Sequence, residues 1–234
     1  RSTDGRAVSG LAPPPSGWER GVLLPACREL ELLPGALESL AALPWRTVAA
    51  VVVNAREDAD AETLEDNAGT MDHLLSLPGA EVSPGLHQLR MDGLDILLLD
   101  RTSEGRRLGR KQGVGIARHM GGGLLCGLVS DGHLSCPWIW STDADARFGP
   151  DYLDPLPEEA GTCVLPYAHR PASEALQIYE LGLRHYALGL AAAGSPYAFP
   201  TIGSTISIRA DIYRGTGGFP DRMAGEDFYL LNKA

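Results

Sequence analysis

The chain has 234 residues, of which 44% are hydrophobic, so it can bury the core of one large domain, and wholesale disorder is excluded. Its formal net charge of −10 argues against general binding to nucleic acid or to an anionic membrane. Its four cysteines form no C-x-x-C pair, which favours buried free thiols in a reducing cytoplasm over a disulfide or zinc framework.

Short apolar runs alternate with segments of helical periodicity along the chain. The runs predict strands at residues 21–26, 48–53, 94–99, 138–142, 162–165 and 202–208. The periodic segments predict helices at 30–41, 60–77, 110–129 and 173–193, with glycines 121–123 as a potential break in the third, and a helix opening at 227–234. This alternation predicts an α/β domain with a mainly parallel sheet.

The two ends of the chain differ from its middle. Residues 1–20 are polar and contain Pro13-Pro14-Pro15, which predicts a flexible N-terminal arm before a domain at 21–234. The chain starts at Arg1 without a methionine and stops as a helix opens, so we expect the native polypeptide to continue past Ala234. No apolar run approaches the ~20 residues that span a bilayer.

Residues 138–153, WIWSTDADARFGPDYL, form the most informative stretch of the chain. An apolar strand signal leads directly to Asp143 and Asp145, and strand alternation predicts that both carboxylates point the same way. Hard oxygen ligands at the carboxyl end of a strand suit Mg²⁺ or Mn²⁺. The pair alone is a weak signal, because most such pairs lie in surface turns, and the alternative role for Asp143 is to cap a following helix.

Four blocks, in this order, resemble the family 2 glycosyltransferases. They are LLPACRELELL at 23–33, LGRKQGVGIARHMGG at 108–122, STDADARFGPDYL at 141–153 and GSTISIRADIYRGTGGFPDRMAGEDFYLL at 203–231. The resemblance extends over residues 21–234 and implies a GT-A fold, a Rossmann-like α/β domain, with a donor half at 21–150 and an acceptor half at 151–234. The chain departs from the family at Arg28, where Asn is usual, and at Asn54 and Asp58, where many members carry an Asp pair.

The resemblance implies transfer of a sugar from a nucleotide-diphosphate donor to an acceptor hydroxyl, with a divalent cation, Mn²⁺ or Mg²⁺, on the phosphates. It implies that Asp145 binds the metal and that Asp143 contacts the ribose or the metal. The residues expected at the donor are Pro25, Ala26, Glu29, Asn54, Arg118 and Asp143.

By the same resemblance Asp227 is the general base and Glu226 supports it, so that a single displacement inverts the anomeric configuration. Both acids also stand at the start of an expected helix, where acidic residues are favoured for structural reasons alone. The loops expected to line the acceptor contain Gly203, Ser204, Gly218 and Phe219, although these positions could equally be turns. The acceptor itself, a sugar, a lipid or a small molecule, is open.

Residues 101–118 hold six basic side chains, where an even spread of the 20 in the chain would place about 1.5. Those at 106–111 crowd the expected start of a helix, where cations are disfavoured, which hints at a diphosphate or an acidic acceptor. A solvated basic face explains them equally well, and Arg118 is the best single candidate. Tyr179 and Tyr186, seven residues apart, are expected in the core.

Three other functions compete with sugar transfer. A catalytically inactive GT-A-like domain could bind a nucleotide-sugar or serve as a scaffold, but the intact Asp143, Asp145, Glu226 and Asp227 argue against it. A nucleotidyltransferase would need an opening Gly-rich loop that the chain lacks, and a haloacid-dehalogenase-type phosphatase would need its nucleophile on the first strand. We therefore expect a metal-dependent glycosyltransferase in the cytoplasm, with membrane association through a segment beyond Ala234 left open.

Overall fold

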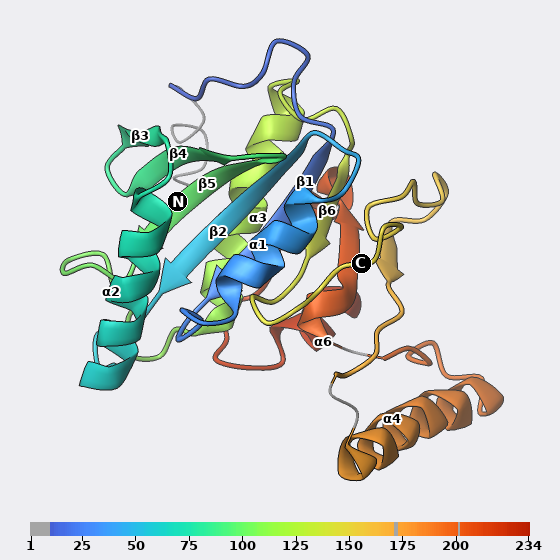
Figure 1. Cartoon of the computed structure of the whole chain (residues 1–234). Helices are drawn as coiled ribbons and strands as arrows, with labels where there is room; N and C mark the ends of the chain where they lie inside the picture. The colour runs from blue at the N-terminus through green and yellow to red at the C-terminus, as the bar shows by residue number, and fades with distance from the viewer. Residues whose placement is uncertain (1–9, 171–172, 201) are drawn as a thin grey trace.

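The computed structural model describes residues 10–170, 173–200 and 202–234. Their strands form one eight-stranded sheet in the order β3-β4-β5-β2-β1-β6-β8-β7 (Figure 1). The four central strands are parallel, namely β5 (Leu94–Arg101), β2 (Thr47–Asn54), β1 (Arg20–Ala26) and β6 (Trp138–Ser141). β1, β2 and β6 are buried along their whole length, as expected for parallel strands that helices cover on both faces.

Both edges of the sheet are antiparallel, unlike its centre. β3 (Gly79–Ser83) and β4 (Leu86–Met91) form a hairpin that continues into β5, and neither strand was predicted from the sequence. Their connections are the dipeptides Pro84-Gly85 and Asp92-Gly93, and both glycines adopt a positive φ. At the other edge β8 (Ile206–Arg209) pairs with β6 and with β7 (Thr162–Val164). The strand predicted at 202–208 is shorter, because Gly203–Thr205 form a 3₁₀ turn.

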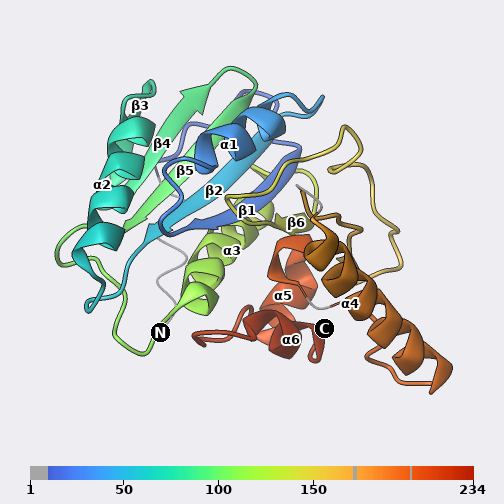
Figure 2. The same ribbon diagram turned by 60° about the horizontal axis from the view of Figure 1, so that its bottom comes forward.

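Helices cover both faces of the sheet, which gives three layers (Figures 1 and 2). The helices of the described residues are α1 (Leu33–Ala41), α2 (Ala61–Leu75), α3 (Val114–Ser130), α4 (Glu174–Ala192), α5 (Ala210–Thr216) and α6 (Glu226–Leu231). α1 and α2 pack with one face of the strands, and α3, α5 and α6 with the other. Glycines 121–123 do not break α3. A Cβ on Gly121 would stand 2.3 Å from Leu23 Cδ1, so the glycine lets α3 approach the sheet closely.

Three further expectations need correction. Residues 10–20 are not a loose arm: Trp18 is 1% exposed and Ala12 exchanges two hydrogen bonds with Gln88, while residues 1–9 lie outside the described residues. α4 buries none of its residues, so Tyr179 and Tyr186 are exposed rather than in the core. All four cysteines are free as expected, but only Cys126 is buried, since Cys136 and Cys163 are partly exposed and Cys27 is exposed.

Among the described residues, every helix is too short or too polar to cross a lipid bilayer.

Candidate functional site

A pocket of about 510 Å³ opens at the carboxyl edge of the parallel strands. Open α/β sheets bind ligands at this edge, because the loops that leave the strands converge there. The pocket is lined by the ends of β1 and β2, the loops that follow them, the start of α3 and the loop after β6. Its lining contains five of the predicted donor residues, Pro25, Ala26, Glu29, Asn54 and Asp143. We refer to it as the donor pocket.

Other side chains of the donor pocket were not predicted from the sequence. They include Cys27, Arg56, Asp60 and Thr63, together with the backbone of Gly113. Arg56 forms an ion pair with Asp58, which also lines the pocket, at 3.1 Å. For Arg56, Asp58 and Asp60, the sequence signal was the polar run 56–60, which follows a buried strand at the edge of the sheet where ligands bind.

Negative charge concentrates at the mouth of the donor pocket. Burial, together with the charges of Asp145 and Asp143, raises the pKa of Glu29 to about 7. Asp145 is exposed and Asp143 is partly buried. Within the described residues no three His, Cys, Asp or Glu side chains form a metal-binding group. The carboxylates present nevertheless fit Mg²⁺ or Mn²⁺, which proteins commonly hold with one or two carboxylates, substrate phosphates and water.

Arg118 lies in α3 and is 3% exposed, and it does not line the donor pocket. Its Nη2 donates to Asp143 Oδ1 at 2.5 Å, and its Nη1 donates to Ser141 Oγ at 2.6 Å. Its Nε donates to Glu226 Oε1 at 3.1 Å. The guanidinium therefore joins the acidic block after β6 to the Glu-Asp pair at the start of α6, two segments far apart in the chain.

Glu226 is buried, whereas its neighbour Asp227 is partly exposed. Burial raises the pKa of Glu226 above its ordinary value, against the opposing charge of Arg118. Asp227 Oδ1 accepts a hydrogen bond from the Phe228 amide at 2.7 Å. Of the two acids, Asp227 is the one that a substrate can reach, and Glu226 is held by Arg118.

The predicted acceptor residues divide into two groups. Gly203 lies against Arg118, because a Cβ there would stand 2.9 Å from Nη2, and Ser204 beside it is partly exposed. Gly218 adopts a φ of +69° and packs on the ring of Tyr213, and Phe219 is 1% exposed. The Phe219 ring is part of the core and is not open to a sugar. No helix follows Asp143, since residues 146–161 form turns and loop, so the alternative that Asp143 caps a following helix is wrong.

The basic run at 101–118 does not gather at one place. It also does not crowd a helix start, because α3 begins only at Val114. Arg106 and Arg107 line a different cavity, beside α2, and Arg110 and Lys111 are exposed. Only Arg118 contacts the predicted site residues.

Arg28 is the one non-glycine residue with a positive φ, 62°, among the described residues. Its amide donates to Oδ1 of Asn67, which is 1% exposed and also bonds the Asn54 carbonyl and Thr102 Oγ1. Asn67 thus fixes the loop after β1 against the end of β2, at the wall of the donor pocket. Asparagine tolerates the left-handed region better than arginine, which gives a physical reason for the Asn that the resemblance to family 2 leads us to expect at this position.

We expect Arg28→Asn to stabilise the protein by roughly 0.5–1 kcal/mol, because it relieves the left-handed strain at the cost of a solvent-exposed ion pair with Glu62. Urea unfolding measures the change in the free energy of unfolding. Arg28→Ala is the control, since alanine keeps the strain and should not stabilise. Equal effects of the two substitutions would contradict the explanation.

No protein-family model and no curated protein matches the chain in sequence. Solved structures match it in fold. The mannosyltransferase PcManGT of Pyrobaculum calidifontis, in complex with GDP-Man and Mn²⁺, is 15% identical with a TM-score of 0.50, and the match covers 96% of this chain and 54% of that one. The glucosyl-3-phosphoglycerate synthase of Mycobacterium tuberculosis, in complex with UDP, is 13% identical with a TM-score of 0.47, covering 92% and 65%.

The chain has the GT-A fold of glycosyltransferases, as four sequence blocks predict. The fold assignment rests on the likeness to the mannosyltransferase, and the chain spans 54% of that enzyme.

Proposed function

We propose that the chain is a metal-dependent, inverting glycosyltransferase that moves a sugar from a nucleotide-diphosphate donor to an acceptor hydroxyl. The observation that carries the proposal is the donor pocket itself. It collects five predicted donor residues from β1, β2 and the loop after β6, and Arg118 joins Asp143 to the Glu226-Asp227 pair. A pocket of about 510 Å³ is of the size that holds a small-molecule substrate.

Two parts of the pocket would bind two parts of a nucleotide-sugar, the nucleoside and the diphosphate. Arg56, Asp58 and Asp60 offer charged and hydrogen-bonding groups for a base and a ribose at the end of β2. Asp143 in the pocket lining and the exposed Asp145, two residues further along the same loop, would hold Mn²⁺ or Mg²⁺, which supplies charge stabilisation to the departing diphosphate. The mannosyltransferase of the same fold supports this division, since it was solved in complex with both GDP-Man and Mn²⁺.

The acceptor hydroxyl is a weak nucleophile while it keeps its proton, so a base must take the proton as the new bond forms. Asp227 is partly exposed, and its Oδ1 is oriented by the Phe228 amide. Arg118 holds Glu226 beside it and draws the donor and acceptor segments together. With the base on the acceptor side, the hydroxyl attacks opposite to the departing diphosphate, and the configuration inverts.

We propose a sugar, a lipid or a small molecule as the acceptor. The proposal also includes membership of glycosyltransferase family 2 and a location in the cytoplasm. Asp227 is partly exposed, which supports an acceptor that reaches it from the solvent.

Calorimetric titration of UDP, GDP and dTDP, with and without Mn²⁺, tests the donor site. We expect one nucleotide to bind with a micromolar Kd in the presence of Mn²⁺, and Asp145→Ala to weaken binding at least about tenfold, because it removes a metal ligand. Asp154→Ala is the matched control, since Asp154 is an exposed carboxylate on the same loop and should leave the Kd unchanged.

Two results would contradict the proposal. Folded protein that binds none of the three nucleotides has no donor site of the proposed kind. If the nucleotide bound equally tightly without Mn²⁺, and equally tightly to Asp145→Ala, then binding of the donor would not depend on a metal.

A further inference from the structure

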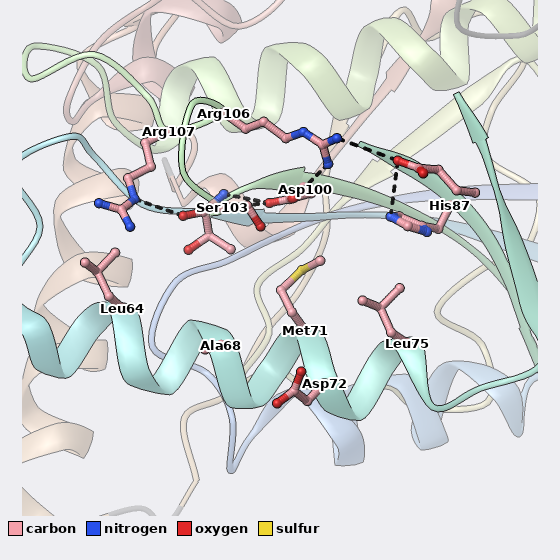
Figure 3. Close-up of a pocket in the computed structure, with 12 residues that line it drawn as sticks. Leu64, Ala68, Met71, Asp72, Leu75, His87, Asp100, Ser103, Arg106 and Arg107 are labelled. Carbon is pink, nitrogen blue, oxygen red and sulfur yellow. Dashed lines mark hydrogen bonds and ion pairs between the residues drawn. The ribbon is translucent and has the colours of Figure 1, made fainter. Parts of the chain in front are cut away.

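A second cavity, of about 530 Å³, lies between α2, the β3–β4 hairpin and the loop after β5 (Figure 3). Its floor is one face of α2, formed by Leu64, Ala68, Met71 and Leu75. These side chains follow helical spacing, yet they are not all covered, and Leu75 is 43% exposed. We call this cavity the α2 groove. None of its lining residues lines the donor pocket.

The wall opposite α2 is polar, but most of its charges are paired. Arg106 Nη1 donates to Asp100 Oδ2 at 3.0 Å, and its Nη2 stands 3.7 Å from Glu81. Burial alone would raise the pKa of Asp100, but the amides of Ser103 and Thr102, together with Arg106, outweigh it and hold the pKa low. Asp100 is therefore ionised, and Arg106 is held in an ion pair with it.

Arg107 is the exception on this wall. Its Nε donates to the Thr102 carbonyl at 3.0 Å, which fixes the side chain. No carboxylate lies within ion-pair distance of its guanidinium among the described residues. In Figure 3 the guanidinium lies across the groove from Leu64, at the end away from Asp72 and Leu75. One end of the groove thus carries a partly buried cation outside any ion pair, whereas the acid Glu81 of the lining lies within ion-pair distance of Arg106 and His87.

We propose that the α2 groove binds a small carboxylic acid with an apolar chain, with the carboxylate on Arg107 and the chain along Leu64, Ala68 and Met71. The apolar floor extends from Leu64 to Leu75, a rise of about 16 Å along α2 at ~1.5 Å per residue, which is long enough for a chain of about eight carbons. Arg107 belongs to the basic run that the donor pocket does not use, so this site is independent of the proposed sugar transfer.

The probe is octanoate, titrated into the ¹⁵N-labelled chain and followed by the amide shifts in two-dimensional NMR. We expect saturable shifts at residues of α2 and at 102–107, and weaker binding of the uncharged analogue octan-1-ol. Arg107→Gln should weaken octanoate binding about tenfold, because it removes the charge and keeps a hydrogen-bonding side chain. Arg110→Gln is the matched control, because Arg110 is an exposed cation of the same run that does not line the groove.

A second variant tests the floor. Ala68 is exposed on α2, so Ala68→Glu should fold normally while placing a carboxylate under the chain and weakening octanoate binding about tenfold. Shifts that do not saturate, or that fall on the exposed face of α4, would overturn the proposal. Equal binding of octanoate by Arg107→Gln and Arg110→Gln, or equal binding of octanoate and octan-1-ol, would also overturn it.

Discussion

Replacing Asp227 with asparagine should lower the turnover of a nucleotide-sugar by about 10²–10⁴-fold and leave the Kd of the donor nearly unchanged. Asparagine has the shape of aspartate and can still accept the Phe228 amide hydrogen bond, but it cannot take a proton from the acceptor. Turnover is measured as the release of nucleoside diphosphate in the presence of Mn²⁺, and the Kd by calorimetry.

Asp221→Asn is the matched control for this substitution. Asp221 is an exposed acid in the loop before α6, and its Oδ2 accepts from Gln112, a bond that asparagine keeps. Turnover of Asp221→Asn should therefore equal that of the wild type. If Asp227→Asn turned over within about threefold of the wild type, a loss far smaller than that of a general base, Asp227 would not be the base.

Replacing Arg118 with methionine should lower the free energy of unfolding by about 3–5 kcal/mol, because it leaves the buried carboxylate of Glu226 without a partner. Urea unfolding measures the loss. Arg184→Met, which removes an arginine that is 53% exposed from its pair with Glu180 on α4, should cost far less. The contrast separates a buried ion pair from an exposed one.

A double-mutant cycle with Glu226→Gln shows whether the ion pair is the cause. The double variant Arg118→Met/Glu226→Gln should lose less unfolding free energy than the two single variants lose in total, because it no longer buries an unpaired charge. Losses that simply add would contradict this explanation, since Arg118 would then stabilise the fold through Asp143, Ser141 and Thr142 and not through Glu226.

The centre of the fold was predictable because its strands are parallel and covered on both faces. Such strands read as continuous apolar runs, as VAAVVV does at 48–53. The β3–β4 hairpin lies at an edge of the sheet and mixes polar with apolar residues, so no apolar run marks it. Its two Gly-containing turns, Pro84-Gly85 and Asp92-Gly93, were the signal that could have found it.

α4 shows where periodicity fails. The spacing of Tyr179 and Tyr186 predicted a helix, and the helix is present over Glu174–Ala192. The same spacing also predicted burial, but burial depends on a second surface that the pattern does not contain. In the described residues the helix extends away from the sheet (Figures 1 and 2), and Tyr186 is 68% exposed.

The residues predicted for the donor gather at one pocket, whereas those predicted for the acceptor do not. Pro25, Ala26 and Asn54 end parallel strands, and the edge of a parallel sheet brings strand ends together whatever their separation in sequence. Arg118 was predicted from sequence as a donor contact, but its partners Asp143 and Glu226 are set by tertiary packing, which no local pattern shows. Tertiary packing also buries Phe219 in the core, which no local pattern around it shows.

The most direct test of the account is the configuration of the sugar first released from an α-linked donor, with water as the acceptor. ¹H NMR follows the anomeric proton before mutarotation, using the nucleotide-sugar whose nucleotide binds in calorimetry, with Mn²⁺. The account predicts release of the β-anomer with the nucleoside diphosphate, and loss of both in Asp227→Asn. Release of the α-anomer would contradict inversion, and tight donor binding without any release would contradict catalysis and favour a nucleotide-sugar-binding domain.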